Sequence, residues 1–371
     1  MRPHRPLRIA QVAPLYESVP PKLYGGTERV VAYLVEELAR RGHEVTLFAS
    51  GDSTAGVPLK AGCIKALRLV GLDHIGAAFH LPMLSEIYEH ADQFDIIHSH
   101  VDYWGFPMAR LVRVPTLSTM HGRLDCAELS TIYGSYRDLP LVSISDAQRS
   151  PLPELNWAGT VFHGLPKDLL RFSHQPRGYL AFLGRIAPEK RPDLAIEIAR
   201  RAGMPLKIAA KVDRTNREYF ERVVRPLLSG PQVEFIGEIS DSEKSDFLGA
   251  ANALLFPVDW PEPFGLAMIE ALACGTPVIA RPCGSVPEVL RDGVTGFVAG
   301  GIENLVKAVR RIGGLSRRAC RQEFETRFTA AVMAANYERI YYDLVAACRA
   351  RVSAADTTTE RKLFARETTR Y

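Results

Sequence analysis

The sequence predicts an α/β protein with two doubly wound, Rossmann-like domains that face each other across a cleft. Two observations lead to this prediction. The chain has 371 residues, which is enough for two domains at about 150 residues each. Strand-like and helix-like segments also alternate along it, and the alternation restarts after a break at residues 162–177. The composition, 47% hydrophobic and 24% charged, is typical of a globular enzyme and excludes disordered and collagen-like classes.

The first half opens with the strand, helix, strand pattern of a parallel sheet. Residues 7–13 form an apolar, strand-like run, and a loop rich in Pro and Gly follows it. The next helix has apolar residues at helical spacing, with Thr27 as its expected N-cap and a stop at Arg41-Gly42. Further strands are expected at residues 44–49, 95–98, 115–120 and 141–144.

The second half repeats this organisation with a different sequence. A strand at residues 179–183 precedes a helix at 192–202, which has Pro192 at its first position. More strands are expected at 206–210, 233–236, 253–256 and 277–280, and helices around 242–250 and 265–273. These patterns predict domains at residues 1–170 and 171–327, a helix at 328–350 that packs back on the first domain, and a polar, disordered tail at 351–371.

Charge and cysteine content limit the partners and the compartment. The six cysteines are widely spaced, which indicates free thiols in a reducing environment. The first apolar run is too short for a signal peptide and no run is long enough to span a membrane, so we expect a cytoplasmic protein. Residues 1–170 carry a net charge of −2 and the remainder +6, which argues against more than peripheral membrane contact through the first half. We expect no nucleic-acid partner.

Two glutamates, Glu262 and Glu270, lie eight positions apart around Pro-Phe-Gly. The first belongs to a loop and the second to a helix, so they cannot form an acid/base pair on one helix face. Glu262, with the exposed amides of Phe264 and Gly265, can hold sugar hydroxyls, and Glu270 can accept hydrogen bonds from both hydroxyls of a ribose. The helix start at Gly265-Leu266 offers a positive end to phosphate. Taken alone, this spacing favours two surface acids without function.

The whole stretch from Glu262 to Ala280 resembles the Glu-x7-Glu signature of retaining glycosyltransferases of family 4, which have the GT-B fold. The resemblance extends over about residues 7–345. It implies an enzyme that moves a hexose from a nucleotide-diphosphate sugar to an acceptor hydroxyl. Other blocks of that family follow in the family's order, namely residues 24–31, His121-Gly122, residues 143–146, Gly184-Arg185 with Lys190, and residues 284–288.

Two basic residues, Arg185 and Lys190, follow the first strand of the second domain. Breaking a sugar-diphosphate bond leaves negative charge on the diphosphate, which a cation must stabilise. An Arg fork and a Lys point charge both suit phosphate, although a solvated basic turn is the alternative. The resemblance assigns the charge-stabilising role to this pair, in place of a metal ion.

Gly25, Gly26 and His121 are the candidates from the first domain. Glycine lets a backbone approach a ligand closely, although Gly25-Gly26 alone is a weak signal and a plain turn is the alternative. The resemblance implies that this loop meets the donor diphosphate and that His121, after a strand, lies beside the donor sugar. Asp125 and Glu128 are weaker candidates for contacting the acceptor.

No catalytic metal or cofactor is expected. The chain has no Asp-x-Asp motif, and His98-Ser99-His100 places two histidines on one strand face without further ligands, so structural histidines are favoured.

The expected reaction is a front-face displacement with retention, which the resemblance implies. UDP-glucose is the preferred donor and GDP-mannose the alternative. A sugar phosphorylase, a nucleotide-sugar epimerase on the same fold and a non-catalytic nucleotide-sugar-binding protein are the competing functions. The acceptor, whether a sugar, a small molecule or a lipid-linked glycan, cannot be read from the sequence.

Overall fold

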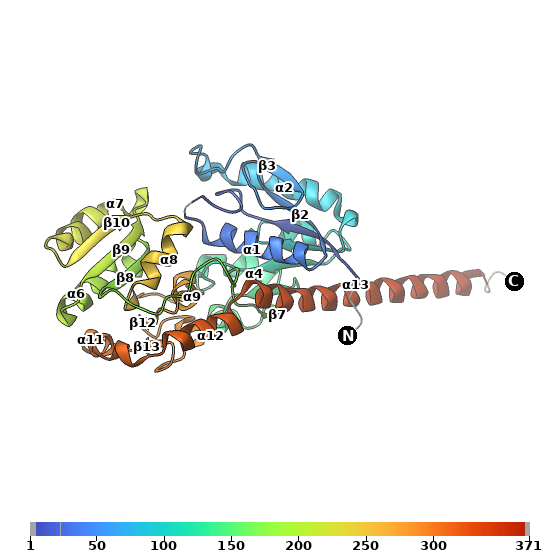
Figure 1. The fold of residues 1–371 in the computed structure, drawn as a ribbon. Coiled ribbons are helices and arrows are strands. Elements are labelled where there is room, and N and C mark those ends of the chain that lie inside the picture. Colours follow the sequence, from blue (N-terminus) through green and yellow to red (C-terminus); the bar gives the residue numbers. More distant parts are fainter. Residues whose placement is uncertain (1–4, 23, 368–371) are drawn as a thin grey trace.

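The computed structural model describes residues 5–22 and 24–367, with side chains as far as Arg351. It contains two parallel sheets in two α/β lobes (Figure 1), which confirms the predicted fold class. Within the described residues, no helix is long and apolar enough to cross a membrane.

The first sheet has seven parallel strands in the order β3-β2-β1-β4-β5-β6-β7. Its strands are β1 (Arg8–Val12), β2 (Glu44–Ser50), β3 (Leu59–Cys63), β4 (Ile96–Ser99), β5 (Thr116–Thr119), β6 (Leu141–Ser143) and β7 (Trp157–Thr160). The helices of this lobe are α1 (Gly26–Arg40), α2 (Ala77–Glu89), α3 (Phe106–Ala109), α4 (Ser130–Ser135) and α5 (Asp146–Arg149).

The second sheet has six parallel strands in the order β10-β9-β8-β11-β12-β13. Its strands are β8 (Leu180–Arg185), β9 (Leu206–Lys211), β10 (Val233–Gly237), β11 (Ala253–Phe256), β12 (Val278–Ala280) and β13 (Gly296–Val298). The helices of this half are α6 (Pro192–Ala202), α7 (Arg217–Tyr219), α8 (Asp241–Gly249), α9 (Leu266–Ala273), α10 (Val286–Val289), α11 (Ile302–Arg311) and α12 (Arg317–Arg327).

Strand order determines where a ligand can bind. The order reverses between β1 and β4 in the first sheet and between β8 and β11 in the second. In a parallel sheet the loops at the carboxyl ends of two such strands diverge and leave a crevice. The loops after β1, β4, β8 and β11 are therefore the expected walls of a binding site.

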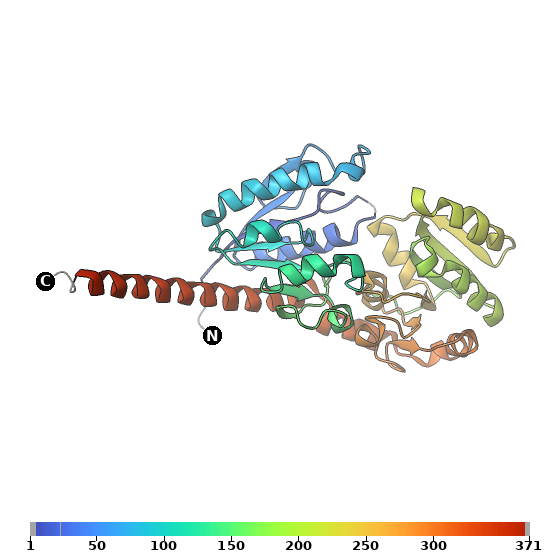
Figure 2. The same cartoon turned by 180° about the vertical axis from the view of Figure 1, so that it is seen from behind.

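The last helix, α13 (Ala330–Glu367), joins the second half of the chain back to the first lobe. Figures 1 and 2 show it running along the first lobe and projecting beyond it. Glu338 binds Arg41 just after the end of α1, at 2.5 Å, and His43, at 3.0 Å. Tyr341 is fully buried and its hydroxyl accepts a hydrogen bond from Gln11 of β1 at 3.0 Å.

The structure differs from the sequence prediction at the start of α1, in several short strands and at the end of α13, and the helices α2, α11 and α12 lie where no element was predicted. Helix α1 begins at Gly26 with Gly25 as its N-cap, and Thr27 lies inside the first turn. The short strands β3, β7 and β13 were not expected; β3 has no buried residue, and such strands lack the apolar pattern of a central strand. Helix α13 continues to Glu367, where a disordered tail was expected from residue 351. Its earlier turns pack on the first lobe, and adding turns to an existing helix avoids the cost of nucleation, even through the run Asp356-Thr357-Thr358-Thr359 of low helix propensity. Residues 368–371 of that tail lie outside the described residues.

Candidate active site

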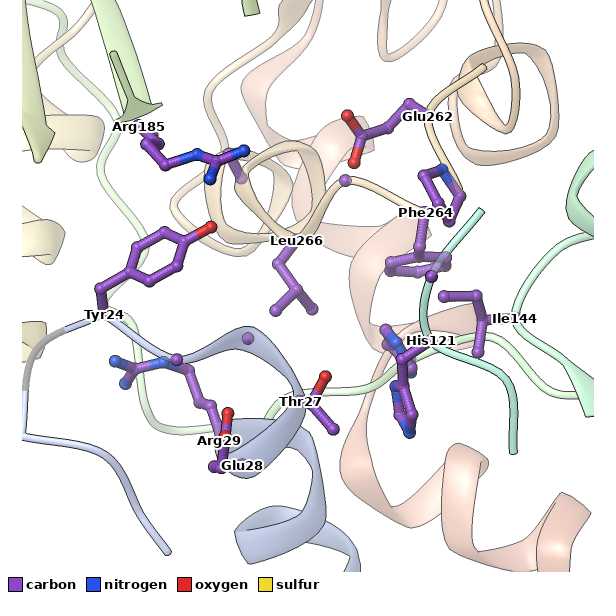
Figure 3. Close-up of a pocket in the computed structure, with 18 of the residues that line it drawn as sticks. Tyr24, Thr27, Glu28, Arg29, His121, Ile144, Arg185, Glu262, Phe264 and Leu266 are labelled. Carbon is purple, nitrogen blue, oxygen red and sulfur yellow. The ribbon is translucent and has the colours of Figure 1, made fainter. Parts of the chain in front are cut away.

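A cavity of about 790 Å³ lies between the two lobes, at the carboxyl ends of both sheets. Figure 3 shows side chains converging on it from both sides, with Arg185 and Glu262 from the second lobe and Thr27 and His121 from the first. The cavity wall includes every residue that the sequence singled out as a catalytic or donor-binding candidate. These are Gly25, Gly26, His121, Arg185, Lys190, Glu262, Phe264, Gly265, Leu266 and Glu270.

The loop that carries Glu262 is held by backbone constraints. Gly265 has φ 83°, and a Cβ there would come within 2.8 Å of Met268 and 2.9 Å of Phe256, so a side chain at this position would be strained. Gly284 packs so closely on the loop that a Cβ would lie 2.3 Å from the Glu262 carbonyl oxygen. The Ser285 amide also donates to that carbonyl at 2.9 Å. The loop is therefore fixed before any ligand binds.

The buried carboxylate of Glu262 contacts two side chains that donate hydrogen bonds, Lys190 and Trp260. Lys190 Nζ forms an ion pair with Glu262 Oε2, and Trp260 Nε1 donates to the same oxygen at 2.6 Å. The Lys190 ammonium lies 4.7 Å from the centroid of the Trp260 ring. The phosphate-binding candidate and the sugar-binding candidate thus form one charged pair. Lys190 has three donors, so it can keep Glu262 oriented while it turns another N–H toward an anion.

Arg185 ends β8 with its guanidinium at the cavity. It donates to Glu189 Oε1 at 2.8 Å and lies 3.6 Å from Asp213 Oδ2. Its buried Nε has no hydrogen-bond partner among the described residues. A buried donor without a partner is costly, so a bound anion would relieve this arrangement.

Glu270 is buried on α9 and holds an ion pair across the site. Lys244 of α8 donates to Glu270 Oε1 at 2.6 Å and lies 3.0 Å from Asp241. Asp241 in turn pairs with Arg29 of α1, which links the two lobes. Within the described part of the chain no hydrogen bond to Glu270 Oε2 is formed, so one carboxylate oxygen is left to accept from a ligand.

His121 belongs to a buried hydrogen-bonded chain that fixes its tautomer. Gln11 Oε1 can only accept, so His100 donates to it through Nε2 at 2.9 Å. His100 Nδ1 is then an acceptor and receives the Nε2 proton of His121 at 2.9 Å. His121 Nδ1 is left with a lone pair and no partner among the described residues. Burial lowers the pKa of His121 to about 3, so the ring is neutral and serves as an acceptor at Nδ1.

His163 completes this wall from the linker between the lobes. Its ring stacks on His121 with centroids 5.2 Å apart and meets Phe264 edge-on at 4.9 Å. The imidazole of His163 therefore fills the space between His121 and Phe264.

The pair His98 and His100 has the structural surroundings that the sequence favoured. His98 is fully buried and its Nε2 bonds Thr119 at 2.7 Å, while its Nδ1 bonds the Tyr341 hydroxyl at 2.7 Å. Among the residues that the structure describes, no three His, Cys, Asp or Glu side chains gather as a metal-binding set. Independence from metal stays a prediction.

The start of α1 presents backbone to the cavity. Gly25 has φ 152°, and a Cβ there would lie 2.8 Å from Pro21. The amides at the beginning of this 15-residue helix are a favourable place for an anion. Glu28 in the first turn is buried, and desolvation raises its pKa to about 7.

Several side chains of the cavity wall were not predicted as site residues. Lys244 and Lys211 line it beside the donor-binding candidates, and His100, which was expected to be structural, also lines it and bonds His121. Only the position of Lys211 at the end of a strand gave a signal, because cations after parallel strands point into the crevice. Asp125 and Glu128, the weaker acceptor candidates, are not part of the cavity wall, and Asp125 instead pairs with Arg123 at 2.6 Å.

Comparison with known proteins gives consistent matches over most of the chain. The family model "Glycosyltransferase Family 4" matches residues 24–159, and the model "Glycosyl transferases group 1" matches residues 170–321. A D-inositol 3-phosphate glycosyltransferase of Rhodococcus erythropolis is 27% identical over 388 residues, which covers 85% of this chain and 86% of the relative.

Two solved structures share the fold. AviGT4, a glycosyltransferase involved in avilamycin A biosynthesis, has a TM-score of 0.70 at 24% identity, with 92% of this chain and 98% of that chain covered. Anabaena Alr3699/HepE in complex with UDP and glucose has a TM-score of 0.70 at 16% identity, with 90% and 98% covered. Both resemble this chain over both lobes.

Proposed function

Because the chain belongs to glycosyltransferase family 4, the group 1 glycosyl transferases, and has their GT-B fold, we propose that it transfers a hexose from UDP-glucose to an acceptor hydroxyl with retention of the anomeric configuration. The observation that carries the proposal is the convergence of Arg185, Lys190, Glu262 and Glu270 on one cavity that two helix N-termini also face. This set matches the parts of a nucleotide-diphosphate sugar.

Each part of the donor has a partner in the proposal. The diphosphate lies against Arg185 and Lys190 and near the start of α1, where charge and backbone amides stabilise it. The free oxygen of Glu270 accepts from the ribose. Glu262 accepts from the sugar hydroxyls, and the lone pair of His121 Nδ1 accepts from another.

The chemical step follows from these positions. The acceptor oxygen forms a bond to the anomeric carbon on the face from which the diphosphate departs. The bond from that carbon to the phosphate oxygen breaks, and the acceptor proton passes to the leaving phosphate. Arg185 and Lys190 stabilise the charge that grows on this phosphate. His121 contributes a hydrogen bond and no proton, because its only N–H is held by His100.

UDP-glucose is proposed as the donor on two supports. The sequence blocks are closest to family members that use it, and a protein of the same fold is known in complex with UDP-glucose, although its 16% identity carries no more than the fold. GDP-mannose is the alternative. The acceptor of the curated relatives is, by their names, D-inositol 3-phosphate.

A donor screen followed by product analysis tests the proposal. UDP- and GDP-sugars are compared by thermal shift, since a ligand that binds the folded state raises the unfolding midpoint. The donor with the largest shift is then incubated with an acceptor panel, with and without EDTA, and the anomeric configuration of any product is read by NMR. We expect a UDP-glucose shift, EDTA-resistant transfer and a retained configuration. Phosphate-dependent cleavage of a disaccharide would support a phosphorylase instead, and binding without turnover a non-catalytic protein.

A further inference from the structure

The first-lobe half of the cavity contains an acidic side chain that the donor does not use. Asp102 lies in the loop after β4, at the strand reversal where the crevice opens, and it lines the cavity. No described residue forms a hydrogen bond or an ion pair with its carboxylate. The side chain is exposed to the solvent of the cavity, and the protein around it raises its pKa through partial desolvation. When ionised, Asp102 therefore gives the first-lobe half of the cavity a negative charge that no described cation pairs with.

The backbone at Asp102 is itself unusual. Its φ is 49°, in the left-handed region that residues other than glycine rarely adopt, at a cost of about 1 kcal/mol or more. The neighbouring turns hold this conformation, with the His100 amide bonded to the Val12 carbonyl at 2.9 Å and the Trp104 amide to the Val101 carbonyl at 3.3 Å. A strained, unpartnered carboxylate that lines a cavity is a common feature of a binding position.

An aromatic wall of Tyr16, His80 and Trp104 stands beside Asp102. His80 is buried and fixed by two hydrogen bonds, at 2.9 Å from the Leu15 amide and 2.8 Å to the Gly76 carbonyl. Its ring contacts Trp104 edge-on, with centroids 4.6 Å apart, and Tyr16 at 5.2 Å. Tyr16 and Trp104 also line the cavity, so their rings offer apolar surface against which a sugar or polyol ring can pack.

The described part of the first lobe contributes three cations to the cavity wall, and each of them is already engaged. Arg29 pairs with Asp241 of the second lobe. Arg68 lies 3.3 Å from Glu17, and its guanidinium is 5.5 Å from the centroid of the Tyr16 ring. Arg123 donates to both carboxylate oxygens of Asp125, at 2.7 and 2.6 Å. The histidines add no charge, because burial lowers the pKa of His80, His100 and His121. A phosphate bound here would lie near Asp102, and each described cation of the first-lobe wall already has an acidic partner.

We infer that the acceptor is an uncharged or amino-bearing polyol, a sugar ring included, that donates a hydrogen bond to Asp102 and packs on the aromatic wall, and that a phosphate monoester is rejected. The inference rests on the proposed function and adds the chemical class of the acceptor. It separates this chain from relatives that are named for a phosphorylated polyol.

Matched acceptor pairs test the inference. UDP release from the donor chosen in the thermal-shift screen is measured with myo-inositol against its 3-phosphate, and with glucose and glucosamine against their 6-phosphates. For each variant, the rate of donor hydrolysis measured without acceptor is the baseline for the rates measured with acceptor. We expect kcat/KM for the preferred unphosphorylated compound to exceed that of its phosphate at least tenfold. Asp102→Asn keeps the left-handed backbone, which Asn tolerates, and should reduce this discrimination severalfold. Asp92→Asn, an exposed acid outside the cavity wall, should preserve it.

The possible outcomes distinguish a failure of the acceptor inference from a failure of the proposed transferase function. Donor hydrolysis together with a preference for phosphorylated acceptors would overturn the inference and leave the proposed function standing. The inference would also fail if Asp102→Asn discriminated as the unaltered protein does, or if no polyol or amino sugar stimulated UDP release. Absence of both donor binding and donor hydrolysis would contradict the proposed function and the inference with it.

Discussion

Glu270 shows how one side chain can serve both the fold and the proposed chemistry. Its Oε1 accepts from Lys244, and its Oε2 is left for the ribose of the donor. Replacing Glu270 with Gln removes the charge and keeps the shape. We expect Glu270→Gln to raise the KM for the donor at least tenfold with a smaller change in kcat, because ribose contacts contribute to ground-state and transition-state binding alike.

Steady-state kinetics with a varied donor concentration checks this expectation. Glu234→Gln, a charge-neutralising change at the edge strand β10, is the matched control. A donor KM that Glu270→Gln leaves unchanged, in a variant with a normal unfolding midpoint, would rule out the ribose role.

The buried Glu28 carboxyl should make the free energy of unfolding depend on pH. Desolvation raises its pKa from 4.5 to about 7, so between these values the folded state binds more protons than the unfolded state. The contribution of Glu28 to the free energy of unfolding is therefore fully present below about pH 4.5, where the group is protonated in both states. It is lost as the pH rises toward 7, because the buried carboxylate must then ionise in the folded state. The shift corresponds to at most about 3 kcal/mol. Glu28→Gln should therefore stabilise the protein at pH 8 and have little effect at pH 4.5.

Urea unfolding at several pH values measures this difference directly. Glu44→Gln, at an exposed position, should show no such trend. A stability gain for Glu28→Gln that is the same at pH 5 and pH 8 would mean that Glu28 is not desolvated as described.

The sequence could identify individual site residues but not their partners. Glu262, Glu270, Arg185 and Lys190 stand in recognisable blocks. The pairing of Lys190 with Glu262 spans 72 positions, and no local pattern indicates it. The chain from Gln11 through His100 to His121 joins β1, β4 and the end of β5, which become neighbours only through the strand order.

At the scale of elements, helix α12 anchors the linker to the second lobe through Arg317. Its guanidinium donates to the carbonyls of Ser173, Gly249 and Ala251 and to the Thr276 hydroxyl, all at 2.7 to 2.8 Å. Removing it would leave four acceptors without that partner. We expect Arg317→Ala to lower the free energy of unfolding by about 2–4 kcal/mol.

Arg317→Lys should recover little of that loss, because an ammonium cannot reproduce the planar fork. Chemical denaturation measures both variants. The adjacent Arg318→Ala is the control, since Arg318 is exposed and no described residue accepts a hydrogen bond from it. Equal effects at the two positions would contradict the anchoring role.

Elements were predictable in proportion to their burial. The central strands β8, β9 and β11 and the helix α6 lie where apolar runs and the Pro192 start predicted them. The strand β3 has no buried residue, and β13 has only three residues, so neither leaves a strong pattern in the sequence. The continuation of α13 depends on a helix already packed on the first lobe, which composition alone does not reveal.

At the level of the whole molecule, hydrogen bonds across the cleft fix how the two lobes are positioned relative to each other. Glu288 of α10 accepts hydrogen bonds from the amides of Asp146 and Ala147 at the start of α5, both at 2.7 Å. Ser145 donates to the Pro263 carbonyl at 2.7 Å. These bonds place the Glu262 loop against the first lobe, so donor and acceptor halves keep one geometry.

Glu288→Ala should weaken the contact between the two lobes, because it removes both of these hydrogen bonds. We expect faster hydrogen exchange at the Asp146 and Ala147 amides, by tenfold or more, and a raised donor KM, because the two halves of the site would be less well aligned. Mass spectrometry of exchanged peptides and donor kinetics provide the two readouts, with Glu303→Gln at an exposed site of α11 as the control. Exchange rates that stay unchanged would show that Glu288 does not hold the lobes together.

In the proposed reaction, Arg185 and Lys190 stabilise the departing diphosphate of a nucleotide sugar. The most direct test measures single-turnover release of the nucleoside diphosphate from bound UDP-glucose in the unaltered protein and in the double variant Arg185→Gln, Lys190→Gln. We predict that the unaltered protein releases UDP and transfers the glucose, and that the double variant is slower by at least a hundredfold at saturating donor. Equal rates in the two proteins, or failure of every nucleotide sugar to react with the unaltered protein, would contradict this prediction.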